Sequence, residues 1–345
     1  MTTNPYYTGP ASDHFDGLRF FNPGQPTTDR SFGDILRWRF GGTRPTTWPK
    51  FVDVRQVKPR PRVDGLVITM VGHATVLVQV AGLNLLVDPV WSDRVSPVSW
   101  AGPRRVEAPG VAFDDLPPID AVLLTHNHYD HLDVQTLRRL WTVHRPRILS
   151  PLGNDAVVAR EVANDETGPI AVEVGDWHQS ICLGEGATAW FHPAHHWSAR
   201  RVGDRRMALW CGFVLTTPSG PVYIAGDTGY GDGAIFRDVR DRYGEPTVAI
   251  LPIGAYAPRW FMKDQHVDPD QALRIMADCG AHQALGVHWG SFNLSDEERL
   301  APKQELAAAL AQRGVPADRF IAVAPGEVWQ AADRSTLSPP AAAAL

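Results

Sequence analysis

Hydrophobic and polar positions follow two different periods along the chain, which predicts a mixed α/β fold. Short runs of β-branched and aliphatic residues broken by Gly-containing turns are typical of strands. Apolar residues spaced as Val134, Leu137 and Trp141 are typical of an amphipathic helix. We expect strands at 66–71, 75–80, 84–87, 119–124, 171–174, 187–191, 208–216, 221–225, 248–251 and 284–287, the first three as an antiparallel meander, and helices at 31–40, 133–144, 233–243, 269–279 and 296–313.

The first 64 residues differ from the rest of the chain in composition. They are rich in Pro, Gly, Asp and Arg with interspersed aromatic residues, so we expect an arm (1–64) that packs on a core domain (65–330). The apolar residues of the predicted arm helix alternate with Arg37 and Arg39. A peripheral membrane contact and a homodimer contact are the alternatives to docking on its own domain. We expect the Pro/Ala-rich segment 331–345 to be a flexible tail.

Composition and charge narrow the class of protein. Of the 345 residues, 44% are hydrophobic and 21% are charged, which excludes wholesale disorder. A formal net charge of −5 argues against a general nucleic-acid partner, which needs a basic face. The chain has no long apolar run, no signal-peptide pattern and no disulfide framework, because its three cysteines are widely spaced. We therefore expect a cytoplasmic protein.

The segment 125–133, THNHYDHLD, lies between a predicted buried strand and a predicted helix. In an extended loop His126 and His128 point the same way, and a turn can aim Asp130 and His131 back at the same space. Four nitrogen and oxygen donors within six residues can serve a pair of metal ions. Without a metal, three imidazoles would crowd together at a strand end and repel one another when protonated. The segment therefore predicts a metal site.

Three later segments also end an apolar strand in a metal-ligating residue type. They carry the histidine cluster His192, His195 and His196, then Asp227 between glycines, and finally His288. Each takes the same position relative to its strand as the first motif. From the residues alone, all three histidines of the cluster compete as ligands. The four motifs together are a strong signal for a metal centre.

The pattern HxHxDH, followed by a separate His, Asp and His, resembles the metallo-β-lactamase superfamily. A closer resemblance is to the N-acyl-phosphatidylethanolamine phospholipase D family, on the segments 71–75 (VGHAT), 87–89 (VDP), 116–122 (LPPIDAV), 251–263 (LPIGAYAPRWFMK) and 265–269 (QHVDP). The resemblance covers about residues 65–330. It implies an α/β fold of the metallo-β-lactamase type, an αββα sandwich of two mixed sheets flanked by helices.

The resemblance also implies two metal sites joined by one carboxylate, which Asp227 would provide. The choice of His196 in the histidine cluster rests on the His-Trp pair of the family motif. Two metals about 3.5–4 Å apart would hold a bridging hydroxide as the nucleophile. Donors without thiolate favour two Zn²⁺ ions, with Mn²⁺ or Fe²⁺ as alternatives. The first metal would be held by His126, His128 and His196, and the second by Asp130, His131 and His288.

Further residues are expected beside the metals. Asp88 ends a strand and can accept the free N–H of a ligand histidine, with an ordinary Asp-Pro turn as the alternative. His266 resembles an active-site residue of the family, a proton donor or phosphate contact, and the alternative is a packed loop histidine. Arg259 and Lys263 could hold a phosphate, or could be solvated charges. Catalytic roles are assigned to Asp130, His266 and Asp88.

These features predict a binuclear zinc-dependent phosphodiesterase of the phospholipase D type. Its substrate would be a small-molecule or phospholipid-like phosphodiester. The alternatives are another hydrolase of the same fold, such as a lactonase, β-lactamase or thioesterase, and a nuclease, which the acidic balance disfavours. A non-enzymatic metal-binding protein is disfavoured by the complete ligand set.

Overall fold

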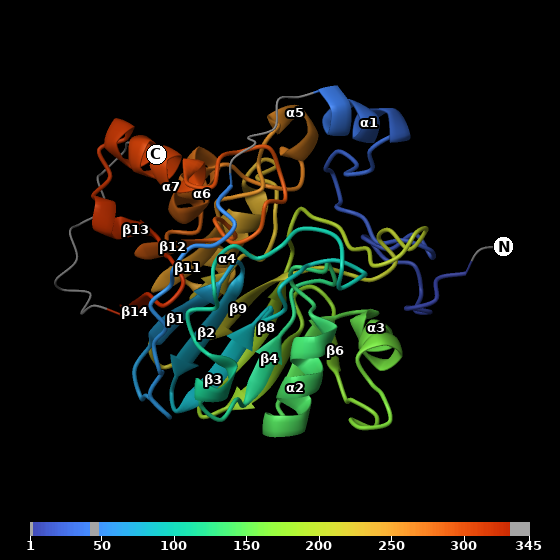
Figure 1. The fold of residues 1–345 in the computed structure, drawn as a ribbon, viewed down its shortest axis with the longest axis horizontal. Coiled ribbons are helices and arrows are strands. Elements are labelled where there is room, and N and C mark those ends of the chain that lie inside the picture. The colour runs from blue at the N-terminus through green and yellow to red at the C-terminus, as the bar shows by residue number, and fades with distance from the viewer. Residues whose placement is uncertain (1–2, 42–47, 332–345) are drawn as a thin grey trace.

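Two β-sheets lie face to face and helices cover their outer surfaces (Figure 1). The structure is a computed structural model that describes residues 3–41 and 48–331. Each sheet has seven strands, in the order β14-β1-β2-β3-β4-β5-β6 and β13-β12-β11-β10-β9-β8-β7. This arrangement is the αββα sandwich that the sequence predicts.

The first sheet contains β1 (Val67–Gly72), β2 (Thr75–Val80), β3 (Leu83–Val87), β4 (Ala121–Leu123), β5 (Arg147–Pro151), β6 (Glu173–Gly175) and β14 (Val328–Gln330). Helices α2 (Val134–His144) and α3 (Asn154–Glu161) pack on its outer face. The second sheet contains β7 (Ser180–Gly184), β8 (Ala187–His192), β9 (Gly212–Thr216), β10 (Val222–Ile224), β11 (Val248–Pro252), β12 (Gln283–Val287) and β13 (Phe320–Ala322). Its outer face carries α4 (Ala234–Tyr243), α6 (Pro269–Asp278) and α7 (Ala301–Gln312). Helices α1 (Phe32–Gly41) and α5 (Arg259–Met262) and the short 3-10 turns at Phe113–Asp115 and Ala317–Arg319 complete the elements.

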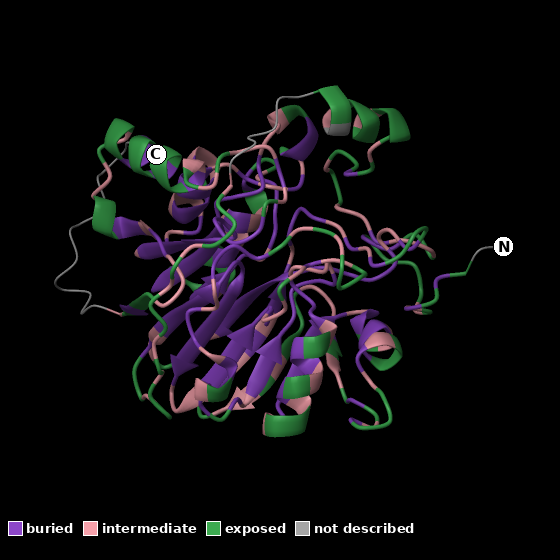
Figure 2. Ribbon diagram, in the orientation of Figure 1, coloured by how far each residue is buried: buried purple, intermediate pink, exposed green. Residues whose placement is uncertain are grey.

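Alternation of side chains along the strands divides the core into three layers. In β2, Val76 and Val78 point between the sheets while Leu77 points outward under the helices. In β9, Phe213 points inward and Val214 outward. Both faces of the central strands are therefore buried (Figure 2). This double burial explains why these strands read as continuous apolar runs in the sequence.

Several predicted elements are confirmed and others need correction. The antiparallel meander is confirmed, because β1 pairs with β2 and β2 with β3 in antiparallel register. The strand predicted over 208–216 begins only at Gly212, because the preceding N–H groups of Leu209 and Cys211 bond to Leu152 and Thr125 outside that ladder. The helix predicted over 296–313 begins at Ala301, with a proline in its first turn, where a missing N–H costs nothing.

The N-terminal arm packs on the sandwich through aromatic side chains. Phe15 and Phe20 are fully buried in one cluster with Trp210. Farther along, α1 lies beside α5 (Figure 1), where the ring of Trp38 stacks on Phe261 with centroids 4.9 Å apart. The tail predicted at 331–345 falls, from residue 332 on, outside the described residues. None of the helices within the described ranges combines the length and apolarity that a bilayer span requires.

Candidate metal centre

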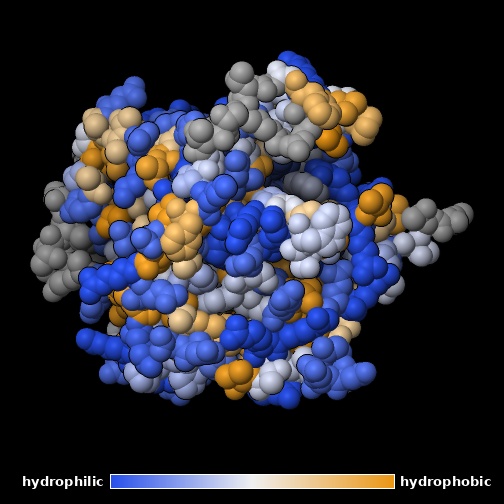
Figure 3. All heavy atoms as spheres, in the orientation of Figure 1, coloured by the Kyte–Doolittle hydropathy of each residue, from blue (hydrophilic) through white to orange (hydrophobic). Residues whose placement is uncertain are grey.

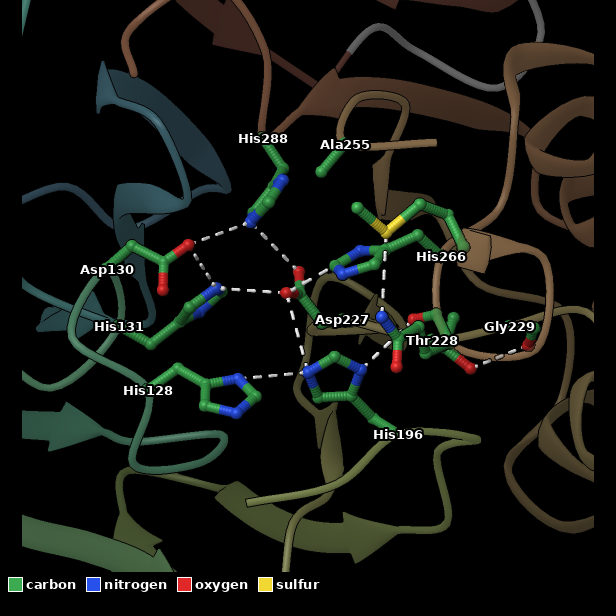
Figure 4. Close-up of polar contacts among 12 residues, drawn as sticks. His128, Asp130, His131, His196, Asp227, Thr228, Gly229, Ala255, His266 and His288 are labelled. Atoms are coloured by element: carbon green, nitrogen blue, oxygen red, sulfur yellow. Dashed lines mark hydrogen bonds and ion pairs between the residues drawn. The ribbon is translucent and has the colours of Figure 1, made fainter. Parts of the chain in front are cut away.

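The predicted metal ligands come together where strands of both sheets end (Figure 4). The loop after β4 carries His126, and the segment after β8 carries His196. Asp227 follows β10 and His288 follows β12. Strands β10, β11 and β12 are parallel, so their carboxyl ends meet at one edge of the sheet, which is the usual place for a site in an α/β fold.

Three imidazoles form the first half of the centre. The Nδ1 atom of His128 lies 2.9 Å from Nε2 of His126 and 3.2 Å from Nε2 of His196. Ligands about 2.0–2.1 Å from a tetrahedral zinc are about 3.3 Å apart, so these nitrogens are spaced as ligands of one ion. Burial is the main reason that the pKa of His128 falls to about 3 and that of His126 well below its usual range. The rings are therefore neutral at pH 7, as metal ligation requires.

A second group surrounds the carboxylate of Asp130. Its Oδ2 atom lies 3.3 Å from Nε2 of His288 and 3.6 Å from Nε2 of His131. Although burial opposes it, the facing carboxylates raise the pKa of His288 to about 9 and that of His131 well above its usual range. The imidazoles in turn hold the pKa of the buried Asp130 well below its usual value. The ionised carboxylate supplies negative charge to this half of the centre.

Asp227 lies between the two groups. Its Oδ2 atom is 3.3 Å from Nε2 of His131 and 3.7 Å from Nε2 of His196, and its Oδ1 atom is 3.3 Å from Nε2 of His288. Burial raises the pKa of this carboxyl, but the surrounding imidazoles outweigh burial and hold it well below the usual value. The preceding Gly226 has φ +62°, and a Cβ there would lie 3.1 Å from Thr125. Asp227 thus lies between the two groups, and its role as a bridging ligand stays a prediction.

Asp88 fixes the orientation of two histidines. Its Oδ2 atom accepts the Nδ1–H of His131 at 2.7 Å, so Nε2 of that ring faces the centre and would be the ligand atom once a metal displaces its proton. The same oxygen accepts the Thr125 hydroxyl at 2.6 Å, and this hydroxyl oxygen lies 2.9 Å from Nδ1 of His126. Thr125 therefore links Asp88 to His126. The sequence alone assigns no role to Thr125. Its position directly before the HxHxDH pattern is the feature that points to a contact with the metal-ligand loop.

His73 is a further histidine beside the centre, and its place in a tight turn after Gly72 predicts a structural or supporting role rather than a metal ligand. Its Nε2 atom lies 3.0 Å from Oδ2 of Asp130, and its backbone carbonyl accepts the N–H of His288 at 2.8 Å. Burial, and then His288, lower the pKa of His73 to about 3, so the neutral ring donates its Nε2–H to the carboxylate. The His73 turn thereby joins the β1–β2 connection to the end of β12. Its signal in the sequence is the tight Gly-His turn of the segment 71–75.

His266 and the segment around it close one side of the centre (Figure 4). The Nδ1 atom of His266 lies 3.8 Å from Oδ2 of Asp227, and burial lowers the pKa of His266 to about 4. The adjacent Gln265 carbonyl lies 3.0 Å from Nδ1 of His196, so it accepts that N–H and fixes the ring with Nε2 toward the centre. His266 is thus a neutral imidazole that neither three-ligand group requires.

The two predicted phosphate contacts occupy different environments. The guanidinium of Arg259 donates to the His266 carbonyl at 2.8 Å and to Gln271 at 2.7 Å, and it pairs with Asp268 at 3.2 Å. It therefore holds the segment that carries His266. Lys263 is exposed at the surface. A phosphate contact for either residue stays a prediction.

The structure separates the three competing histidines. Only His196 reaches the centre. His195 forms an isolated bridge with Gly229, and its ring lies beside Gly231. His192 is the last residue of β8 and bonds through Nε2 to the carbonyl of Ile235 in α4. Both therefore lie outside the two ligand groups.

The donor set fits a pair of metal ions. Within the described residues, the buried atoms His131 Nε2, His288 Nε2 and Asp227 Oδ1 have no hydrogen-bond partner. His288 Nε2 lies 3.3 Å from Asp227 Oδ1, and His131 Nε2 lies 3.3 Å from Asp227 Oδ2. Buried polar atoms without partners are costly, and a bound cation would satisfy all three. A cleft of about 1280 Å³ opens beside this centre and is lined by His128 and Trp197 among others.

Comparisons with known proteins agree with this geometry. Residues 83–289 match a family model described as a β-lactamase superfamily domain. The chain is 35% identical over 276 residues to the Caenorhabditis elegans protein named N-acyl-phosphatidylethanolamine-hydrolyzing phospholipase D 1, covering 78% of this chain and 77% of that protein. It is 35% identical over 234 residues to the mitochondrial N-acyl-phosphatidylethanolamine-hydrolyzing phospholipase D of Saccharomyces cerevisiae, covering 65% of this chain and 47% of that protein.

Among solved structures, the isothiocyanate hydrolase from Delia radicum gut bacteria matches with a TM-score of 0.59 at 24% identity, covering 77% of this chain and 99% of that one. At this identity the likeness shows the fold alone. The family model carries the assignment further, because it spans the predicted ligands from the HxHxDH loop to His288, and so does the Caenorhabditis elegans relative, because it is 35% identical over 78% of the chain. The chain therefore belongs to the β-lactamase superfamily of metal-dependent hydrolases, close to the N-acyl-phosphatidylethanolamine-hydrolysing phospholipases D.

Proposed function

We propose that this protein is a binuclear zinc-dependent phosphodiesterase that hydrolyses a phospholipid-like phosphodiester in the manner of a phospholipase D. The observation that carries the proposal is the 35% identity over 78% of the chain to a relative named for hydrolysis of N-acyl-phosphatidylethanolamine. The seven-residue ligand set, joined through Asp227, supports a site for two ions. Manganese and iron are the alternatives to zinc.

The chain's own residues have separate tasks in this reaction. When bound, the two ions would supply a nucleophilic water at neutral pH and polarise a phosphoryl oxygen. Asp88 holds the proton of His131 on Nδ1, which keeps Nε2 available as a ligand. His266 lies beside Asp227 without a place in either group of ligands, so we assign its neutral ring a hydrogen bond from N–H to a phosphate oxygen of the substrate. Arg259 keeps His266 in position through its carbonyl.

The cleft beside His128 fits a substrate with an extended body. Its volume of about 1280 Å³ exceeds the upper end of ordinary small-molecule sites, about 1,000 Å³. Arginines outnumber carboxylates among its lining residues, and although Arg201 pairs with Glu161, Arg138 and Arg160 leave the lining positive on balance for an anionic headgroup. Trp197 stands against the His128 ring, with centroids 4.3 Å apart, and provides an apolar wall.

An assay panel tests the reaction class. The zinc-loaded and manganese-loaded protein is incubated with bis(p-nitrophenyl) phosphate, N-acyl-phosphatidylethanolamine in mixed micelles, a lactone and nitrocefin. We expect phosphodiester turnover and no comparable rate on the lactone or on nitrocefin. Absence of turnover on every phosphodiester by both metal forms would overturn the proposal. Release of phosphatidic acid, rather than diacylglycerol, would identify cleavage on the phospholipase D side.

A lipid substrate would explain why an apolar face of α1 is exposed. Phe32 and Phe40 are 75% and 79% exposed, and Ile35 and Leu36 lie on the same helix surface with 44% and 41% exposed (Figure 3). A contiguous exposed apolar face is typical of an interaction surface. We assign this face to a membrane surface, because the proposed substrate resides there and α1 packs on α5, which adjoins the His266 segment.

Vesicle flotation tests the membrane contact. Replacing Phe32 and Phe40 together with Ser should abolish flotation with anionic vesicles while hydrolysis of soluble bis(p-nitrophenyl) phosphate stays unchanged. Phe51→Ser, at an exposed phenylalanine outside α1, is the matched control and should float like the parent protein. A parent protein that does not float, and whose dimer becomes a monomer in the double variant, would show a homodimer contact instead.

A further inference from the structure

A second cluster of metal-ligating side chains lies on the outer side of the second sheet. His178, His192 and Asp238 place one ligand atom each within 4.8 Å of the others. Phe191 points into the core between the sheets, so the next residue along β8, His192, points to the opposite side, where α4 lies. The cluster shares no residue with the centre described above.

His192 is arranged as a ligand histidine. It is fully buried, and its Nε2–H donates to the carbonyl of Ile235 at 2.8 Å. That bond leaves the lone pair on Nδ1, and this buried atom has no hydrogen-bond partner among the residues that the structure describes. Metal-bound histidines characteristically donate the other ring N–H to a carbonyl in this way. Burial lowers the pKa of His192 to about 4, so the ring is neutral at pH 7.

His178 and Asp238 reach the same point from the turn after β6 and from α4. His178 has φ +67°, a left-handed conformation that is uncommon outside glycine, and its backbone N–H donates to Phe191 at 2.7 Å. Its ring stands edge-on to His192 with centroids 6.0 Å apart. His178 is exposed and the Asp238 side chain is 33% exposed, so an ion can enter from solvent.

We propose that His178, His192 and Asp238 bind a divalent transition-metal ion, Zn²⁺ in the first instance, outside the catalytic centre. Two imidazole nitrogens and one carboxylate oxygen are a usual zinc donor set, and water from the solvent-exposed side completes a tetrahedron. The ion would tie the turn after β6 and the end of β8 to α4. Since β7 is the edge strand of its sheet, the site would stabilise the edge of the sandwich.

Arg242 would compete with a metal ion for the carboxylate of Asp238. Its Nε atom lies 2.7 Å from Oδ2 of Asp238, one helical turn away. A bound cation has to share or displace this pair and is repelled by the guanidinium. Removal of Arg242 should therefore tighten metal binding, which is the opposite of what a residue that merely supports the fold would do.

Zinc stoichiometry and anomalous diffraction test the site. The full-length protein with its catalytic centre loaded is titrated with Zn²⁺ alone, and zinc per chain is measured by elemental analysis. We expect the parent protein to bind one equivalent more than His178→Asn, since Asn accepts a positive φ and the position is exposed. Asp238→Asn should weaken this equivalent by at least about tenfold. Arg242→Gln should tighten it by about threefold.

Asp241→Asn is the matched control, because this exposed carboxylate lies on the same helix and pairs with Arg240. It should keep the extra equivalent. Crystals soaked in Zn²⁺ should show an anomalous peak between the three side chains. The proposal is overturned if no peak appears there, or if the parent protein and the His178 variant bind equal amounts of zinc. Turnover of bis(p-nitrophenyl) phosphate should be the same in both, because His178 lies outside the catalytic centre.

Discussion

Replacement of Asp88 with Asn tests how the protein controls its metal ligands. The carboxylate is 1% exposed and accepts three hydrogen bonds, from the Thr125 N–H at 2.8 Å, the Thr125 hydroxyl at 2.6 Å and the His131 Nδ1–H at 2.7 Å. An amide of the same shape can accept on one side only. If its oxygen keeps the Thr125 N–H, its NH₂ group faces the His131 ring.

The ring of His131 then has two unfavourable choices. If the ring keeps its proton on Nδ1, this N–H and the NH₂ group of the introduced asparagine oppose each other as two buried donors. Otherwise the proton moves to Nε2, the atom that faces Asp227. The second choice removes the lone pair from the metal side. Changes in such supporting partners typically weaken metal binding by about 10- to 100-fold, which corresponds to about 1.4–2.8 kcal/mol. We expect this loss at the ion beside Asp130 and a smaller one at the other.

Chelator competition measures the two metal affinities separately from stability. Asp133→Asn is the control, because this buried carboxylate, at the end of the loop that carries His131, bonds to the backbone of Trp91, Ser92 and Gln135 and to no histidine that the structure describes. It should lower the free energy of unfolding by about 1–3 kcal/mol and leave both metal affinities unchanged. If the Asp88 variant retained both ions with parental affinity, the tautomer argument would be wrong.

Three further predictions concern the bridge, the core and the arm. Asp227→Ala should bind at most one tight equivalent of metal at the catalytic centre, counted against the parent protein by elemental analysis, and two full equivalents there would refute its bridging position. Phe213→Ala should lower the free energy of unfolding by about 3–5 kcal/mol in urea titrations, because this ring is fully buried between the sheets; a loss below about 1 kcal/mol would contradict its placement. Burial lowers the pKa of His14, but hydrogen bonds to Asp176 and Asp13 outweigh burial and raise it above the ordinary 6.5. The stabilisation by His14 is then complete below pH 6.5 and is lost as the pH rises through the higher folded pKa, so His14→Gln should cost more stability near about pH 5.5 than near about pH 9; an equal cost at both would show that charge plays no part.

The central strands were predictable because a strand that is buried on both faces appears in the sequence as a continuous apolar run. The six residues of β2 are all buried, and the predicted range 75–80 coincides with the strand. Strands β13 and β14 have three residues each, and they form because they pair with neighbouring strands. β14 forms because its residues pair with β1 from the far end of the chain, which no local pattern can reveal.

The side chains that gather at the candidate centre were predictable for a related reason. A histidine or aspartate directly after an apolar run marks the end of a buried strand, and strand ends meet at one edge of the sheet. The sequence assigns His73 a structural or supporting role without naming its partner Asp130, which lies far away in sequence, and it assigns Thr125 no role, because that role depends on a single hydroxyl proton. From the residues alone His192 competes with His196, and the structure separates them because strand alternation sends the His192 side chain to the face opposite the core residue Phe191.

The metal centre also connects the two halves of the sandwich. His126 and Asp130 follow β4 of the first sheet, whereas His196 and Asp227 follow strands of the second. An ion held by ligands from both sheets binds the folded sandwich and not the unfolded chain, so binding must stabilise the packing of one sheet on the other. Within the described residues, buried atoms of this centre such as His288 Nε2 and Asp227 Oδ1 have no hydrogen-bond partner, which is costly in the metal-free chain. Catalytic competence and the stability of the interface between the sheets are therefore coupled in this protein.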